Sequence, residues 1–307
     1  MKVTALAGGT GAAKLLRGLA AAGADLTVIV NTGDDTEVWG LHVSPDLDTI
    51  TYALSGRLDL ARGWGRADES FRCLESMAAL DAPTWFALGD RDLATHLVRT
   101  QALTDGRSLS EITADLARRQ GVGSAVVPMS DDRVRTRVRT PGGWLTFQEY
   151  FVREKARVEV LEVVYEGAAQ SRPAPGVLSA IAEADVVVVC PSNPVTSIGP
   201  ILAVPEVTGA LAATRARVVA VSPIIGGAAV SGPAGQLMAA RGLPVSPLGV
   251  ARAYAPWLDA LVIAPDDEPL AADLRAAGVA PAIADVMMTD RASEAALARQ
   301  TLEAAAP

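Results

Sequence analysis

Hydrophobic residues recur along the chain in short runs separated by longer segments of helical spacing. Residues 3–7 form the first apolar run, and after a glycine cluster leucines recur three and four residues apart until Gly23, a natural end for a helix. Residues 26–30 form a second apolar run, as expected for a parallel strand that is buried on both faces. This order predicts a βαβ unit at the start of the chain.

The pattern changes in the middle of the chain. Apolar residues are spaced as in helices from about residue 57 to residue 121. Residues 134–140 and 144–151 then flank a Pro-Gly-Gly turn, which predicts a β-hairpin. We interpret this section as an insertion.

Apolar runs of strand length return at residues 186–190, 218–221 and 261–264, with helix-length segments between them. We therefore predict an α/β protein with a Rossmann-like, doubly wound and mostly parallel sheet and an inserted helical and hairpin substrate domain. The predicted boundaries are 1–56 and 153–307 for the nucleotide-binding domain and 57–152 for the insertion.

The composition favours a small-molecule partner. Of the 307 residues 50% are hydrophobic, so the chain can bury a large core. Its net charge of −8 opposes binding to nucleic acid or to an anionic membrane, because both require clustered lysine and arginine. Two cysteines are too few for a disulfide framework or a zinc site, and the start of the chain lacks the apolar segment of an export signal. We expect a cytoplasmic protein.

Gly9, Thr10 and Gly11 lie between the first predicted strand and helix. Glycines there let the backbone approach a ligand, and the first N–H groups of the helix are unpaired donors at the positive end of its dipole. Lys14, one turn into the helix, adds a positive charge. We predict a phosphate or diphosphate site; the alternative is a turn that only lets strand and helix pack.

Two familiar nucleotide motifs are incomplete in this sequence. Lys14 replaces the third glycine of the dinucleotide fingerprint, and the second strand ends in Asn31-Thr32 rather than in an acid that binds ribose. The spacing of a Walker A loop is also missing. The sequence therefore disfavours a nicotinamide dehydrogenase and a classical P-loop nucleotidase.

Acidic residues follow the second predicted strand. Asp46 and Asp48 are expected at the same sheet edge as the glycine loop, with Asn31 among the nucleotide contacts. Carboxylates beside a diphosphate require a cation between them, and Mg²⁺ commonly binds one or two carboxylates together with phosphate oxygens. We expect Asp46 and Asp48 to contact Mg²⁺ or the acceptor hydroxyl; the alternative is that they only start a helix. Asp34 and Asp35 are expected to be ordinary loop residues.

A charged cluster at residues 88–96 opens a helix in the insertion. Its Arg91 has the planar fork that suits phosphate or carboxylate, and the alternative is a solvated helix start. His96 and His42 are interpreted as packing residues.

Two later loops are rich in hydroxyl, amide and exposed backbone groups. Ser192, Asn193 and Ser197 follow one strand, and Ser222 and Gly226 follow the next. Such groups suit the recognition of a nucleotide, and the alternative is ordinary sheet-edge turns. No serine, cysteine and histidine pattern of covalent catalysis occurs in the sequence.

Seven motifs, taken together and in this order, closely resemble the 2-phospho-L-lactate transferase family over nearly the whole chain. They are Gly8 to Gly11 with Lys14, Ser44 to Thr49, Leu88 to Asp92, Pro128 to Asp132, Phe147 to Glu149, Pro191 to Pro200, and Ser222 to Gly235. The family has a Rossmann-like fold with an inserted substrate domain and is typically dimeric and magnesium-dependent, so the resemblance implies a homodimer that uses Mg²⁺.

The resemblance also implies a reaction. The ribityl hydroxyl of a deazaflavin precursor, 7,8-didemethyl-8-hydroxy-5-deazariboflavin, attacks the phosphorus that bears the lactyl or enolpyruvyl group of a guanosine-diphosphate-linked donor, and GMP leaves. This is a step of coenzyme F-420 biosynthesis. The glycine loop and the two later loops would hold the guanosine diphosphate, while Asp48 and Arg91 would lie near the deazaflavin as catalytic residues. The alternative is a non-catalytic nucleotide-sugar-binding regulator of a related Rossmann family, which lacks the paired aspartates.

Overall fold

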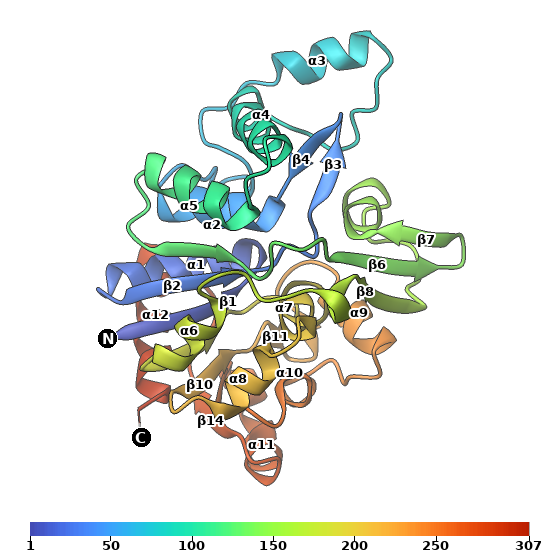
Figure 1. Ribbon diagram of the computed structural model, residues 1–307. Helices are drawn as coiled ribbons and strands as arrows, with labels where there is room; N and C mark the ends of the chain where they lie inside the picture. The colour runs from blue at the N-terminus through green and yellow to red at the C-terminus, as the bar shows by residue number, and fades with distance from the viewer. Residues whose placement is uncertain (307) are drawn as a thin grey trace.

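The computed structural model describes residues 1–306 (Figure 1). Seven parallel strands form the central sheet in the order β14-β13-β10-β9-β1-β2-β5, which confirms the α/β fold predicted from the sequence. In chain order these strands are β1 (Lys2–Ala7), β2 (Asp25–Val30), β5 (Ala125–Pro128), β9 (Val186–Val189), β10 (Arg217–Val221), β13 (Ala260–Ile263) and β14 (Ala280–Ile283).

The central strands are buried on both faces, which explains their continuous apolar sequence. In β9, Val187 and Val189 pack into the core on one face, and Val186 and Val188 pack into the core on the other. Burying each such side chain contributes on the order of 1.5–3 kcal/mol. The two cores therefore fix which way each strand faces.

Helices cover both faces of the sheet (Figure 1). On one face pack α1 (Gly9–Ala21), α2 (Pro45–Leu54), α5 (Leu109–Arg119) and α12 (Arg291–Ala304). On the other pack α6 (Val177–Glu183), α7 (Gly199–Ala203), α8 (Val207–Ala213), α9 (Ala234–Ala240), α10 (Pro247–Tyr254) and α11 (Ala271–Ala276). Short helices η2 (Ala168–Gln170), η3 (Pro194–Ile198) and η4 (Pro265–Leu270) and the strand pair β11 (Ile224–Ile225) and β12 (Ala228–Ala229) complete this part.

The segment that we expected as a separate insertion, 57–152, contributes to the central sheet. Its β5 pairs in parallel with β2, and its α5 packs on the same core as α1. A four-residue strand gives too short an apolar run to be distinguished from the helical pattern around it. The predicted insertion 57–152 therefore includes β5, which belongs to the central sheet.

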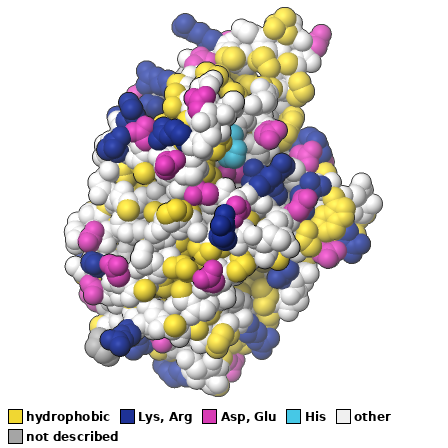
Figure 2. All heavy atoms as spheres, in the orientation of Figure 1, with side chains coloured by type: hydrophobic (Ala, Val, Ile, Leu, Met, Phe, Trp, Pro, Cys, Tyr) yellow, Lys and Arg dark blue, Asp and Glu magenta, His cyan; other side chains and the backbone are white. Residues whose placement is uncertain are grey.

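Three further groups of elements lie over the carboxyl end of the sheet. They are β3 (Thr36–Val38) with β4 (Leu41–Val43), α3 (Arg72–Ala79) with α4 (Asp90–Thr104), and the antiparallel sheet β7-β6-β8 of Gly143–Thr146, Arg135–Thr140 and Glu162–Glu166. The helix α3 has no buried residue, and hydrophobic side chains reach the surface around it at the top of Figure 2. Acidic and basic side chains lie interspersed on the face shown there.

The predicted hairpin forms, but its second strand is shorter than expected. The strand β7 ends at Thr146, and residues expected to continue it form the short helix η1 (Glu149–Arg153). Glu149 Oε2 accepts a hydrogen bond of 2.8 Å from the Thr146 backbone N–H, and Thr146 Oγ1 accepts one of 3.2 Å from the Glu149 N–H. This reciprocal capping starts a helix where apolar spacing alone indicated a strand.

Within residues 1–306 no single helix is long and apolar enough to cross a membrane. One pair of short helices, Pro194–Ala203 and Val207–Ala213, bent by 88°, passes that test on length and composition only.

Candidate active site

A cavity of about 790 Å³ opens over the carboxyl edge of the central sheet. Its wall includes the loops that follow β1, β2, β9, β10 and β14, and the segments between α2 and α4 and around η1 cover it. The chain runs from β1 to β2 on one side and places β9 and β10 on the other, so the cavity lies at the point where the strand order reverses. Ligands of doubly wound folds bind at this position.

The glycine loop forms one wall of the cavity, and its glycines are required by close packing. A Cβ atom on Gly8 would lie 2.6 Å from Asp46 Oδ2, and one on Gly11 would lie 2.4 Å from the carbonyl oxygen of Pro191. Gly9 has a φ of +73°, which side chains disfavour. Gly9, Thr10, Gly11 and Lys14 all line the cavity, and their contact with a phosphate stays a prediction.

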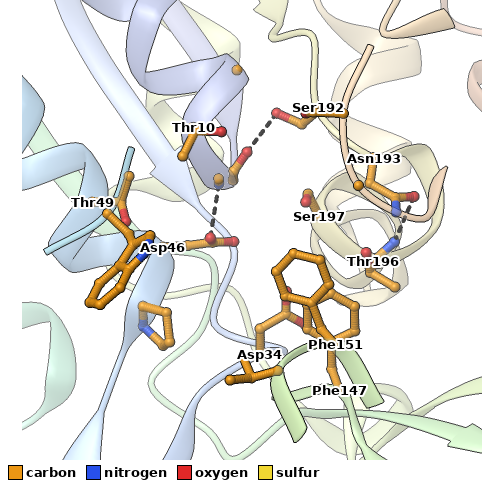
Figure 3. Close-up of a pocket in the computed structure, with 18 of the residues that line it drawn as sticks. Thr10, Asp34, Asp46, Thr49, Phe147, Phe151, Ser192, Asn193, Thr196 and Ser197 are labelled. Atoms are coloured by element: carbon orange, nitrogen blue, oxygen red, sulfur yellow. Dashed lines mark hydrogen bonds between the residues drawn. The ribbon is translucent and has the colours of Figure 1, made fainter. Parts of the chain in front are cut away.

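Asp46 lies directly against the start of α1 (Figure 3). Its Oδ1 accepts a hydrogen bond of 2.8 Å from the Gly9 N–H, and its Oδ2 accepts one of 2.9 Å from Asn31 Nδ2. Burial raises the pKa of Asp46 to about 6, although both hydrogen bonds act in the opposite direction. The carboxylate is therefore held at the N-terminal end of α1, where burial makes its charged form unfavourable.

Asp34, expected from the sequence to be an ordinary loop residue, is a second buried carboxyl in the same wall. Its Oδ1 has no hydrogen-bond partner within residues 1–306. Burial, reinforced by the charge of Asp46, raises the pKa of Asp34 well above its ordinary value. In the sequence, only its position just after the second strand pointed to this role, and that position does not distinguish Asp34 from Asp35.

Asp34 and Asp46 together fit a hard cation. A divalent ion between them would relieve the repulsion and burial that raise both pKa values, and it would give the free Oδ1 of Asp34 a partner. Across residues 1–306 no three acidic, histidine or cysteine side chains are grouped as a complete metal site. A cation here would therefore need oxygens from a ligand, as Mg²⁺ commonly does in phosphate sites.

Asp48 also lines the cavity, but a buried arginine already neutralises it. Arg99 Nη1 donates to Asp48 Oδ2 at 3.0 Å, and Arg99 Nη2 contacts Oδ1. His96 Nδ1 lies 3.7 Å from Asp48 Oδ2, and His96 Nε2 lies 3.4 Å from Asp92 Oδ1. Asp48 thus has a cationic partner already, whereas Asp34 and Asp46 have none within residues 1–306. The role expected for Asp46 and Asp48 at Mg²⁺ stays a prediction.

Four of the polar residues expected to contact a nucleotide line the cavity: Ser192, Asn193, Ser197 and Ser222. Ser192 Oγ donates to the Gly8 carbonyl at 2.8 Å, which ties the loop after β9 to the glycine loop. Asn193 Oδ1 accepts from the Val195 N–H at 2.9 Å and caps η3. These contacts fix the shape of the wall.

Three predicted site residues are not in the wall of the cavity. Asn31 lies behind Asp46, which it positions, and Gly226 donates its N–H to Asp267 at 3.1 Å. Arg91 is exposed on α4, because Asp92, His96 and Arg99 share the buried face of that helix and Arg91 does not. Helix phase turns the Arg91 side chain to solvent, and hydrogen bonds to Asp46 and Asp267 hold Asn31 and the Gly226 backbone outside the wall.

Aromatic side chains form another part of the wall. Trp64, Trp85, Phe86, Phe147 and Phe151 all line the cavity. The rings of Phe147 and Phe151 stack with centroids 5.5 Å apart and lie near Asp34 in Figure 3. The cavity therefore combines the glycine-loop wall with surfaces on which a flat ring system can stack.

Comparison with known proteins agrees with this arrangement. Residues 3–302 match the family described as 2-phospho-L-lactate transferase CofD. A phosphoenolpyruvate transferase of Streptomyces griseus subsp. griseus is 49% identical over 313 residues, which cover 99% of this chain and 98% of the relative. A 2-phospho-L-lactate transferase of Methanococcoides burtonii is 46% identical over 258 residues, which cover 83% of this chain and 84% of the relative.

A solved structure supports the fold. The crystal structure of a protein member of the upf0052 family from Bacillus halodurans superimposes with a TM-score of 0.64, at 18% sequence identity, and the match covers 98% of both chains. At this identity the likeness concerns the fold alone.

Proposed function

The chain belongs to the 2-phospho-L-lactate transferase CofD family, and from this premise we propose that it moves a phospholactyl or phosphoenolpyruvyl group from a guanosine-diphosphate-linked donor. The acceptor is the ribityl hydroxyl of the deazaflavin precursor, and the step belongs to coenzyme F-420 biosynthesis. The protein acts as a cytoplasmic homodimer on small molecules, without nucleic acid or membrane.

One observation carries this proposal beyond the family name. A single cavity joins the glycine loop and the Asp34–Asp46 pair to the aromatic surfaces of Phe147 and Phe151. A transfer between a diphosphate donor and a flat aromatic acceptor needs both kinds of wall within reach of one another.

In the proposed reaction the hydroxyl oxygen forms a bond to the phosphorus that carries the three-carbon acid. The bond from this phosphorus to the bridging oxygen breaks, GMP leaves with its electron pair, and the hydroxyl proton passes to solvent. The diphosphate binds to the N–H groups of Thr10 and Gly11 and to Lys14, because the Gly9 N–H already donates to Asp46. Asp34 and Asp46 would hold Mg²⁺, which would supply positive charge where the leaving phosphate becomes more negative.

We propose phosphoenolpyruvate as the three-carbon unit. The relatives that match over 98–99% of this chain at 47–49% identity bear the name phosphoenolpyruvate transferase. The test is to offer the deazaflavin precursor with equal amounts of the enolpyruvyl and the lactyl donor and to identify the product by mass spectrometry. Enolpyruvyl product should predominate; a lactyl product instead would reverse the choice of donor and leave the reaction type standing.

A further inference from the structure

The turn between α2 and α3 brings Arg62 into the wall of the cavity. Asp59 Oδ1 accepts hydrogen bonds of 2.9 Å from the backbone N–H groups of Ala61 and Arg62, and Asp59 Oδ2 lies 2.8 Å from Arg62 Nη2. The same Nη2 donates to the carbonyl of Arg66 at 2.9 Å. The turn therefore holds one nitrogen of this guanidinium in place.

Two aromatic rings fix the plane of the same group. The Cζ atom of Arg62 lies 5.3 Å from the ring centroid of Trp64 and 5.1 Å from that of Phe71. An arginine stacked in this way loses little further freedom when it binds a planar anion.

Arg62 still has hydrogen-bonding capacity to offer. Its Nε is buried and has no partner within residues 1–306. A ligand cannot reach that buried atom, but the side chain as a whole is 28% exposed, and its Nη1 makes no hydrogen bond within the described residues. Nη1 is therefore the donor that a bound acceptor can reach. The side chain is thus restrained but unsatisfied.

The turn also packs close to the phosphate-binding loop. A Cβ atom on Gly63 would lie 3.5 Å from Thr10 Cγ2. Among the described residues of the cavity wall, Lys14 and Arg62 are the lysine and arginine side chains. Lys14 Nζ donates to the Met288 carbonyl at 2.8 Å, which orients it from the loop after β14.

We propose that Arg62 binds the carboxylate of the three-carbon acid on the donor and thereby selects donors that carry one. This inference rests on the proposed function. The diphosphate occupies the start of α1, so the remaining anionic group of the donor is this carboxylate, and the guanidinium fork matches carboxylate geometry. Arg62 is then a specificity-determining residue for the donor.

The test measures equilibrium binding of three probes by titration calorimetry: the guanosine-diphosphate-linked lactate, the same molecule with its carboxylate converted to a carboxamide, and GDP. Arg62→Gln should weaken binding of the carboxylate probe by about tenfold or more, the scale of a charge-assisted contact. Binding of the carboxamide and of GDP should stay near the wild-type value. The control Arg72→Gln removes an exposed arginine from the same segment and should change none of the three.

Equal weakening of all three probes, or of none, would overturn the assignment, because only a carboxylate contact changes their ratio. Arg62→Lys keeps the charge but not the fork, and we expect it to restore part of the preference. If wild-type protein binds no guanosine nucleotide, the proposed function itself fails and the inference falls with it.

Discussion

At the scale of single residues, the pair formed by Asp48 and Arg99 has the clearest energetic consequence. Both side chains are buried. Burial lowers the pKa of Arg99, but the carboxylate of Asp48 outweighs this effect, so the pKa is raised overall. Each charge is therefore tolerated only because the other is present.

Asp48→Asn should lower the free energy of unfolding by about 3 kcal/mol or more, because it leaves the Arg99 charge buried and unpaired. Chemical denaturation measures this change. Asp115→Asn is the matched control: Asp115 pairs with Arg118 and Arg119 near the surface and should matter far less. Adding Arg99→Met to Asp48→Asn should restore part of the loss. A single variant as stable as wild type would contradict the buried pair.

The sequence predicted the residue types of the site better than it predicted which side chains face the cavity. Ten of the predicted positions line the cavity, among them the glycine loop, Asp46 and Ser192. Asp34 and Asp35 are neighbours of the same type, and only the backbone path after β2 decides that Asp34 faces the cavity. Arg62 and Arg91 likewise cannot be told apart by residue type. The turn at Asp59 directs Arg62 toward the cavity.

At the scale of elements, continuous apolar runs predicted β1, β2, β9, β10 and β13 to within a residue or two. The edge strand β14 was missed because it is half exposed and contains Pro281, so it has neither a continuous apolar run nor a strict alternation. Strands in the middle of the sheet have continuous apolar sequences because both of their faces are buried, and an edge strand lacks that signal.

Gly11→Ala tests how the start of α1 is packed. The new Cβ would lie 2.4 Å from a backbone oxygen of Pro191, so the helix must move away from the loop after β9. We expect a loss of stability of about 1–3 kcal/mol and weaker GDP binding, both measurable on one preparation. Gly209→Ala in α8 is the control, because its Cβ meets nothing within 4 Å and should be neutral or stabilising. Two variants that behave alike would argue against the close packing.

At the scale of the whole molecule, the buried carboxyls make stability depend on pH. Burial raises the pKa of Asp46 to about 6, and that of Asp34 shifts in the same direction. A carboxyl with a higher pKa in the folded state binds its proton more tightly there, so its contribution to stability is full below about pH 4 and is lost as the pH rises through 6.

Between pH 4 and pH 7 the Tm of the metal-free wild type should therefore fall further than that of Asp46→Asn. The difference in the free energy of unfolding is about 3 kcal/mol at most. Added Mg²⁺ should reduce that loss in the wild type and not in the variant. Thermal melts across the pH range with chelator or Mg²⁺ provide the comparison, and parallel curves for the two proteins would contradict the shifted pKa.

The central claim is that the Asp34–Asp46 wall and the glycine loop perform magnesium-dependent transfer to a deazaflavin. Its most direct measurement is the formation of phosphodiester-linked deazaflavin and GMP, followed by mass spectrometry with Mg²⁺ or with excess chelator. Wild type should form both products in equal amounts with Mg²⁺ only, and Asp34→Asn should lower kcat by about 10²-fold or more while its melt stays intact. Full turnover in chelator, or a wild-type rate for Asp34→Asn, would contradict the account.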